Sequence, residues 1–254
     1  MATTTPLSQP DAQPEKPLMG LGGRLIGIFI SPTETFADIV RRPSLAWVAP
    51  LVVLTILAAV SSGLVIHRVG MEQMEQIVRS QLAQSRMTQN LTPEQMERAV
   101  ERGVTVAKYK AYIGPLLFPF IGLLIVAGVF ALMTNFVLGS EVKYTTLMSV
   151  TAYGMMPGLV LGIVNIITIH LKKPADIDIQ NIVVSNLGPL VSAESSKVLH
   201  RLASFIDLFS FWQIALMALG ISIAARFSFG KGLVAVVVPW LVWVLAVAGL
   251  SALF

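Results

Sequence analysis

The chain contains no cysteine, which excludes disulfide bonds, thiol catalysis and every metal site built from cysteine. Its three histidines, His67, His170 and His200, are far apart in sequence, and none has the close spacing that a zinc site on one helix needs. There is no phosphate-binding loop, no glycine-rich dinucleotide motif after a strand and no pair of catalytic carboxylates. We therefore expect no metal and no cofactor, and we predict that the protein is not an enzyme.

Charge is also scarce. Charged residues make up 13% of the 254 residues, whereas soluble domains carry about 25%. The net charge is +4, but the basic residues are dispersed and no basic run alternates with aromatic residues, which argues against nucleic acid as a partner. With a mean hydropathy of +0.75, the composition predicts that most of the chain lies in a lipid bilayer.

Five apolar stretches have the length of about 20 residues that crossing the hydrocarbon core requires. We predict an all-α integral membrane protein with a five-helix transmembrane bundle, and spans at about 46–66, 113–138, 147–169, 205–225 and 233–253. These spans belong to one membrane domain, residues 46–254. Because the number of spans is odd, the two termini are expected on opposite sides.

The segment before the first span is predicted to lie at the membrane surface. Residues 1–17 are polar and proline-rich and are predicted to form a disordered tail. Residues 18–45 are an interfacial segment, in which a capping box at Ser31 and Glu34 predicts an amphipathic helix from Pro32 to about Arg42. Its apolar face and its basic end form a candidate surface for a partner or the membrane: Phe36, Ile39, Val40, Arg41 and Arg42.

Two longer connections are predicted to build a helical cap outside the membrane. Residues 67–112 carry apolar residues at helical spacing and a second helix start at Thr92, which predicts a helical hairpin. Residues 170–204 form a cap loop beside it. The hairpin is either a solvated cover over one end of the bundle or a module that binds a partner.

The third span has the most unusual composition. Three glycines four residues apart form a flat strip on one helix face, and a proline beside them favours a bend. The strip serves either to pack helices closely or, together with the bend and an asparagine, as part of a binding or moving site; its residues are Tyr153, Gly154, Pro157, Gly158, Gly162 and Asn165.

Two further polar residues lie close to the apolar spans. Asp207 stands at the start of the fourth span, where it either caps a helix or forms an intramembrane functional site. Asn135, in the second span, is expected to hydrogen-bond between helices or to a ligand.

Three short motifs resemble a known family. Residues 32–36 (PTETF), followed by Pro43, look like the segment before the first span in bacterial members of the Yip-domain family. Residues 153–157 (YGMMP) are similar to the family's aromatic-small-x-x-Pro pattern, and residues 207–212 (DLFSFW) are similar to its start of the fourth span. These proteins are five-span relatives of the Ypt/Rab-interacting Yip proteins.

The resemblance implies a location and an orientation. It implies the bacterial cytoplasmic (inner) membrane, with the N-terminus in the cytoplasm and the C-terminus on the opposite side. Only seven of the 18 basic residues would then be cytoplasmic, so the charge count alone favours the opposite orientation. The chain lacks the Asp-Leu-Tyr-Gly-Pro motif that eukaryotic members carry before the first span, which argues against a Rab-type GTPase as a partner.

Two functions remain open at this stage. The first is a non-enzymatic scaffold or adaptor that binds membrane lipids and other membrane proteins, associates with itself, or shapes the bilayer. The alternative is a transporter or channel-like protein for a lipid or small solute, in which the proline-bent third span lines the path.

Overall fold

The computed structural model describes residues 17–43, 45–85, 88, 90–174, 177, 182–192 and 196–251. The predicted disordered tail therefore lies, except for Pro17, outside the described residues. The described part of the chain is helical, and its extended backbone pairs only in an isolated bridge between Asn186 and Asp207. The helices are α1 Leu21–Ile30, α2 Pro32–Arg41, α3 Val48–Gln84, α4 Pro93–Ala131, the π-helix η2 Leu132–Val137, α5 Tyr144–Gly154, α6 Pro157–Leu171, the 3₁₀-helix η4 Gly188–Leu190, α7 Lys197–Ser204, α8 Leu208–Ala225 and α9 Phe229–Leu250.

Five helical segments are long and apolar enough to cross a membrane, which confirms the predicted five-span all-α architecture. They are Val48–Gly70, Pro93–Val137, Tyr144–Leu171, Leu208–Ala225 and Phe229–Leu250. At 1.5 Å per residue, α8 and α9 extend about 27 and 33 Å, close to the thickness of the hydrocarbon core. The protein is therefore an integral multi-pass membrane protein.

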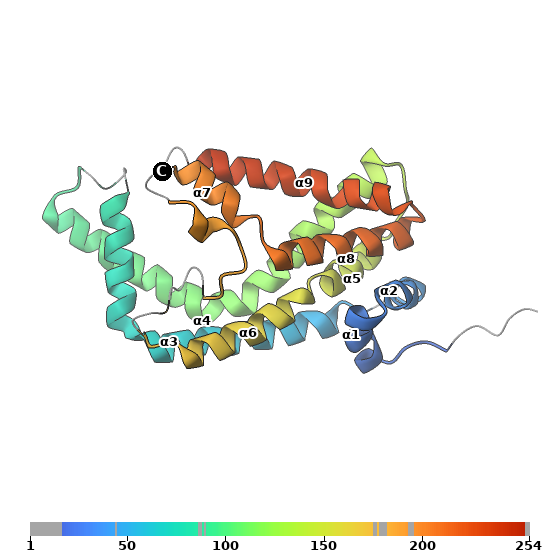
Figure 1. Ribbon diagram of the computed structural model, residues 1–254, viewed down its shortest axis with the longest axis horizontal. Coiled ribbons are helices and arrows are strands. Elements are labelled where there is room, and N and C mark those ends of the chain that lie inside the picture. Colours follow the sequence, from blue (N-terminus) through green and yellow to red (C-terminus); the bar gives the residue numbers. More distant parts are fainter. Residues whose placement is uncertain are drawn as a thin grey trace, which may run out of the picture.

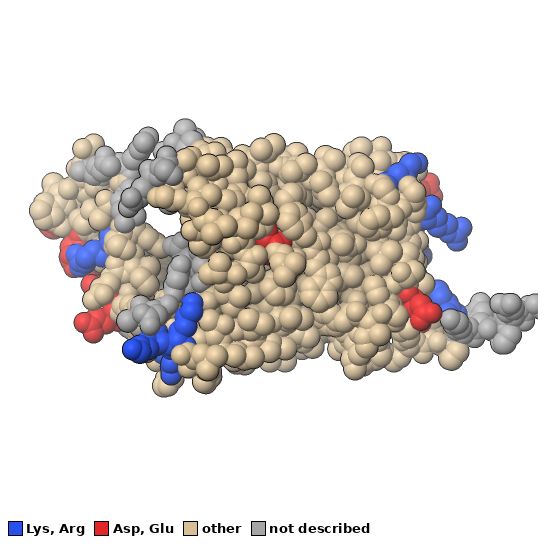
Figure 2. Space-filling model, in the orientation of Figure 1, with Lys and Arg blue, Asp and Glu red and all other residues tan. Residues whose placement is uncertain are grey.

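The distribution of charge agrees with this assignment. Figure 2 shows Lys, Arg, Asp and Glu side chains gathered toward the two ends of the long axis, with a wide band between them that is almost free of charge. The spanning helices run along this axis, with α1 and α2 near one end and the turn between α3 and α4 at the other (Figure 1).

The predicted hairpin is formed by parts of α3 and α4. Gly70 interrupts α3 with φ +76° and ψ 169°, a conformation that side chains with a Cβ disfavour, and the chain turns there out of the first span. The predicted helix start at Thr92 is confirmed as a capping box, in which the Thr92 hydroxyl accepts from the Gln95 N–H at 3.3 Å and the Gln95 side chain accepts from the Thr92 N–H at 2.9 Å.

The N-terminal helices differ from the prediction in what they contact. The apolar face of α2 lies against α8 and α5, so Phe36 and Ile39 are 0% exposed and are not a surface for lipid or a partner. The capping box expected at Ser31 does not form, because the Ser31 hydroxyl makes no cap and α2 follows α1 after this single residue. Sequence periodicity marked the apolar face correctly but did not indicate that protein would cover it.

A buried ion pair joins the two N-terminal helices. The Arg24 guanidinium of α1 donates to Asp38 of α2 at 2.7 Å, and both side chains are less than a tenth exposed. Asp38 also accepts from the backbone N–H of Met19 at 3.0 Å. The two partners lie 14 residues apart in sequence, outside the window of helix periodicity, so the sequence pattern did not indicate the pair.

This ion pair gives a first prediction. Asp38→Ala should lower the free energy of unfolding in detergent by about 3–5 kcal/mol, because it leaves the Arg24 charge buried without its partner. The double variant Arg24→Leu/Asp38→Leu should recover most of this loss, because neither charge then remains. Arg98→Ala, which breaks an exposed ion pair with Glu94, is the control and should change the unfolding transition little. A transition in Asp38→Ala that matches that of Arg98→Ala would contradict the prediction.

Candidate functional site

The third span is broken near its middle. α5 ends at Gly154, α6 begins at Pro157, and Met155 and Met156 form a turn between them. Pro157 has no N–H to donate to the Tyr153 carbonyl one turn earlier, and that carbonyl accepts from the Met156 N–H at 3.1 Å instead. The helix is therefore interrupted at the proline from which a bend was predicted.

The three glycines of this span lie against two other spans of the same chain. A Cβ at Gly154 would stand 2.4 Å from the side chain of Met217 and 3.4 Å from its backbone, on α8. A Cβ at Gly162 would stand 2.3 Å from the Leu57 side chain of α3. At Gly158, between them, the nearest atoms would be 3.6 and 3.7 Å away, which is ordinary contact. Close packing within the chain therefore accounts for Gly154 and Gly162.

Buried polar groups lie in α5, just before the break. Tyr153 is 0% exposed and belongs to the same core cluster as Phe36 and Ile39. The Tyr153 hydroxyl and the Thr151 hydroxyl have no hydrogen-bond partner among the described residues. The buried Arg24–Asp38 pair is close enough to Tyr153 to interact with it electrostatically.

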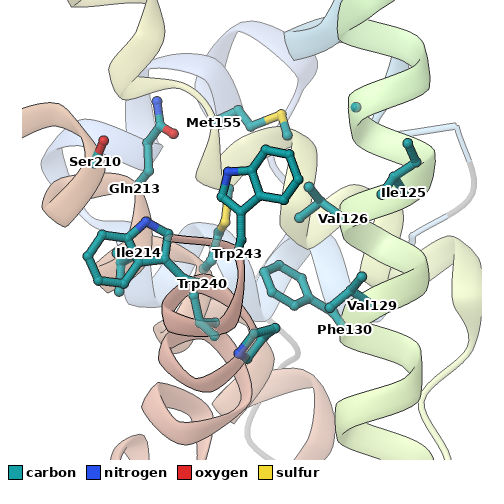
Figure 3. A pocket seen from close by; sticks show the side chains of 14 residues that line it. Ile125, Val126, Val129, Phe130, Met155, Ser210, Gln213, Ile214, Trp240 and Trp243 are labelled. Carbon is teal, nitrogen blue, oxygen red and sulfur yellow. The ribbon is translucent and has the colours of Figure 1, made fainter. Parts of the chain in front are cut away.

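A half-open pocket of about 380 Å³ lies between α4, α8 and α9, next to the break. Met155 reaches it from the break, Met217 and Gln213 line it from α8, and Trp240 and Trp243 line it from α9. Figure 3 shows Trp243 lying across the pocket between Gln213 and Val126 of α4. Most of the lining is aliphatic or aromatic, so the pocket suits an apolar occupant.

Asp207 caps a helix. Its side chain accepts from the Ser210 N–H at 2.8 Å, which satisfies a free donor at the start of α8, and it also accepts from the Ser185 hydroxyl. The Leu208 N–H donates to the Ser185 carbonyl at 3.2 Å beside this contact. These bonds hold the cap loop against α8 and leave Asp207 in a structural position.

Asn135 closes the link between the second and third spans. Its side-chain amide donates to the Val142 carbonyl and its side-chain oxygen accepts from the Val142 N–H, both at 2.9 Å. The π-helix η2, which contains Asn135, widens the last turn of the span at this point. The polar side-chain atoms of Asn135 are therefore bonded to the backbone of the segment that links the second and third spans.

The remaining candidate residues are not brought together. Asn165 of α6 is half-buried and does not line the pocket, and its side chain makes no hydrogen bond with any described residue. Val40 is half-buried, and Arg41 and Arg42 are exposed at the end of α2. Sequence reasoning missed Gln213, Trp240 and Trp243 as neighbours, because each alone looks like an ordinary residue of an apolar span.

The described residues contain no group of three His, Asp or Glu side chains that could hold a metal ion.

The family model described as Yip1 domain matches residues 26–251, from within α1 to just past α9. The match confirms, over nearly the whole chain, the resemblance read from the three short motifs. The chain matches no curated protein and no solved structure.

The unequal packing of the glycines gives a second prediction. Gly154→Ala should lower the free energy of unfolding by about 1–3 kcal/mol, because the added methyl group overlaps Met217 and presses on its backbone. Gly158→Ala is the matched control, and it should be neutral or stabilise slightly, because alanine favours a helix over glycine by about 1 kcal/mol. Denaturation of both variants in one detergent measures the difference, and equal transitions would refute it.

Proposed function

We propose that this chain, which belongs to the Yip1 domain family, is a non-enzymatic adaptor that binds other membrane proteins. The observation that carries the proposal is a two-helix arm, defined as residues 71–84 of α3 and 93–112 of α4. The segment from Pro93 to Val137 has 45 residues, whereas about 20 residues cross a bilayer. The α4 part of the arm therefore consists of helical residues in excess of those needed to cross the membrane.

The arm is built to hold its shape. A Cβ at Gly103 of α4 would stand 2.6 Å from the Val78 side chain of α3, so the two helices pack closely. Arg79 of α3 donates to Glu97 of α4 at 3.1 and 3.2 Å, and to Glu75 on its own helix at 3.4 Å. These bonds, first to Glu97 and then to Glu75, raise the pKa of Arg79 above its ordinary value. A preformed arm loses little conformational freedom when it binds a partner.

The base of the arm has the composition of a membrane boundary. Tyr109 and Tyr112 of α4 are 63% and 61% exposed, and Lys108 and Lys110 lie beside them in sequence and are also exposed. Tyrosine rings at the interface, with lysine side chains reaching to the headgroups, are typical of a helix leaving the bilayer. The part of the arm before Tyr109 would then stand in water.

At the other end of the bundle, α1 provides the lipid contact that α2 does not. Leu21, Ile26 and Ile30 of α1 are 60%, 62% and 77% exposed, whereas Arg24 on its other side is buried against α2. An apolar outer face on a short helix suits insertion into the headgroup region, where it would anchor this end or shape the bilayer.

The proposal includes a location, the bacterial cytoplasmic membrane with the N-terminus in the cytoplasm, which rests on the family resemblance. The ion pairs of the arm bear on the contrary charge count. Arg79 and Arg98 are paired with Glu97 and Glu94, so these two basic residues contribute less to topology than unpaired flanking residues would.

A second candidate is the transport of a small solute or lipid along the bent third span. The pocket beside Met155 favours a lipid over a polar solute, because its lining is mostly apolar. Asn165, the polar residue that the sequence placed on such a path, does not line the pocket.

The adaptor proposal predicts that the outer face of the arm touches protein. Photo-crosslinking side chains at Gln76 and Ser80, both exposed and on the side of α3 opposite Val78, should capture the same membrane protein in native membranes at native expression, as identified by mass spectrometry. The matched control is a crosslinker at Val78, which is 9% exposed and faces α4, and should give only adducts within the chain. Lipid alone, or different proteins at the two exposed positions, would contradict the adaptor role.

A further inference from the structure

We propose that the pocket between α4, α8 and α9 binds a membrane phospholipid, with one acyl chain in the pocket and its ester group beside Gln213. This inference goes beyond the adaptor proposal and does not rest on it. The occupant follows from the location of the pocket, its polar groups and the way in which its walls diverge.

The location selects a lipid chain over water. The wall from α4 consists of Gly122, Phe130 and aliphatic residues such as Ile125, and all the helices around the pocket belong to membrane spans. In the hydrocarbon layer, space that protein leaves open is in contact with acyl chains, since almost no water is present there. The volume of about 380 Å³ lies within the range of about 300–1,000 Å³ that is usual for small-ligand sites.

One wall of the pocket carries polar groups without partners. The side chains of Gln213 and Ser210, on one face of α8, line the pocket and make no hydrogen bond with any described residue. Gln213 lies about 8 Å along α8 from Leu208. Figure 1 shows that α8 begins part-way along α9 rather than level with its end.

Polar groups at this depth require a partner. An amide or hydroxyl group in hydrocarbon without a hydrogen bond is unfavourable by several kcal/mol. The Gln213 side chain has two N–H donors, and the carbonyl of a lipid ester is an acceptor. A bound lipid would therefore satisfy groups that the protein leaves open, which an ordinary boundary lipid with a purely apolar contact does not do.

The tryptophans fit the mouth of such a site. Trp243 is 62% exposed although it lies across the pocket, so its ring is available to a molecule arriving from the bilayer. Trp240 is fixed behind it by an aromatic contact with Phe211, with ring centroids 6.1 Å apart. Indole rings combine a large apolar surface with one N–H donor, which suits the boundary between a chain and its polar group.

The pocket is open because its walls belong to separate helix pairs. α4 packs along α3 and α9 packs along α8, whereas α4 and α9 hardly touch. Gly122 leaves open space beside α4, because a Cβ there would have no atom within 4 Å. A side chain at this position would therefore begin in open space and extend toward the pocket that Gly122 lines.

The test compares two substitutions in the same helix. The full chain is reconstituted in phosphatidylcholine that carries a diazirine in one acyl chain, irradiated and digested, and adducts are quantified on the α9 peptide that contains Trp240 and Trp243. Gly122→Phe should lower this labelling about tenfold, the equivalent of about 1.4 kcal/mol, because the ring occupies the space of the chain. Gly128→Phe is the matched control, because Gly128 also has no atom within 4 Å of a Cβ but does not line the pocket, and its labelling should equal that of the native chain.

A second comparison tests the polar contact and needs no variant in α4. The native chain should label more strongly with an ester-linked lipid than with the ether-linked analogue, and Gln213→Leu should abolish this preference while keeping the pocket apolar. Equal labelling of Gly122→Phe and the native chain, or an equal loss in Gly128→Phe, would show boundary lipid only and overturn the proposal. Equal labelling of the native chain by the two lipids would overturn the assignment of the ester to Gln213.

Discussion

The bundle depends on one feature: the third span is interrupted at Met155 and Met156 and packs closely against other spans on both sides of this break. Along its 28 residues it lies mainly against α8 before the break and against α3 after it. Pro157 removes one backbone N–H at the break, and glycines before and after it supply the close approach, with Gly154 against α8 and Gly162 against α3. Met155, in the break, also lines the pocket, so the break and the pocket meet at this residue.

The N-terminal helices complete the bundle where the third span alone would leave it open. α2 covers α8 and the first half of the third span, and its Phe36 lies where a Cβ at Gly220 would be only 2.8 Å away. The Arg24–Asp38 pair holds α1 on α2 at the same place. A buried ion pair gives little net stability compared with apolar residues, but it is satisfied in one arrangement only, so it specifies how the two helices meet.

The sequence predicted features that depend on neighbouring residues along the chain. It did not predict features that depend on which residues of another helix lie opposite. Span number follows from hydropathy over about 20 residues, and the break at Pro157 follows from a missing N–H, so both could be predicted. The burial of Phe36 could not be, because an amphipathic face looks the same whether lipid or α8 covers it. The pocket could not be predicted either, because Gln213 and Trp243 lie on different helices and come together only through packing.

The two features with proposed binding roles are also the ones that the bundle needs least. The proposed arm begins after Gly70, where the chain turns out of the first span, and the pocket lies where α4 and α9 hardly touch. Stability comes from the α3–α4 and α8–α9 pairs and from the bent span between them. Exposed side chains of the arm and residues that border the open pocket are therefore expected to change without loss of the fold, whereas buried contacts within the arm, such as Gly103 with Val78, are part of the α3–α4 packing. Partner and lipid preference are accordingly expected to depend on a few exposed side chains rather than on the architecture of the bundle.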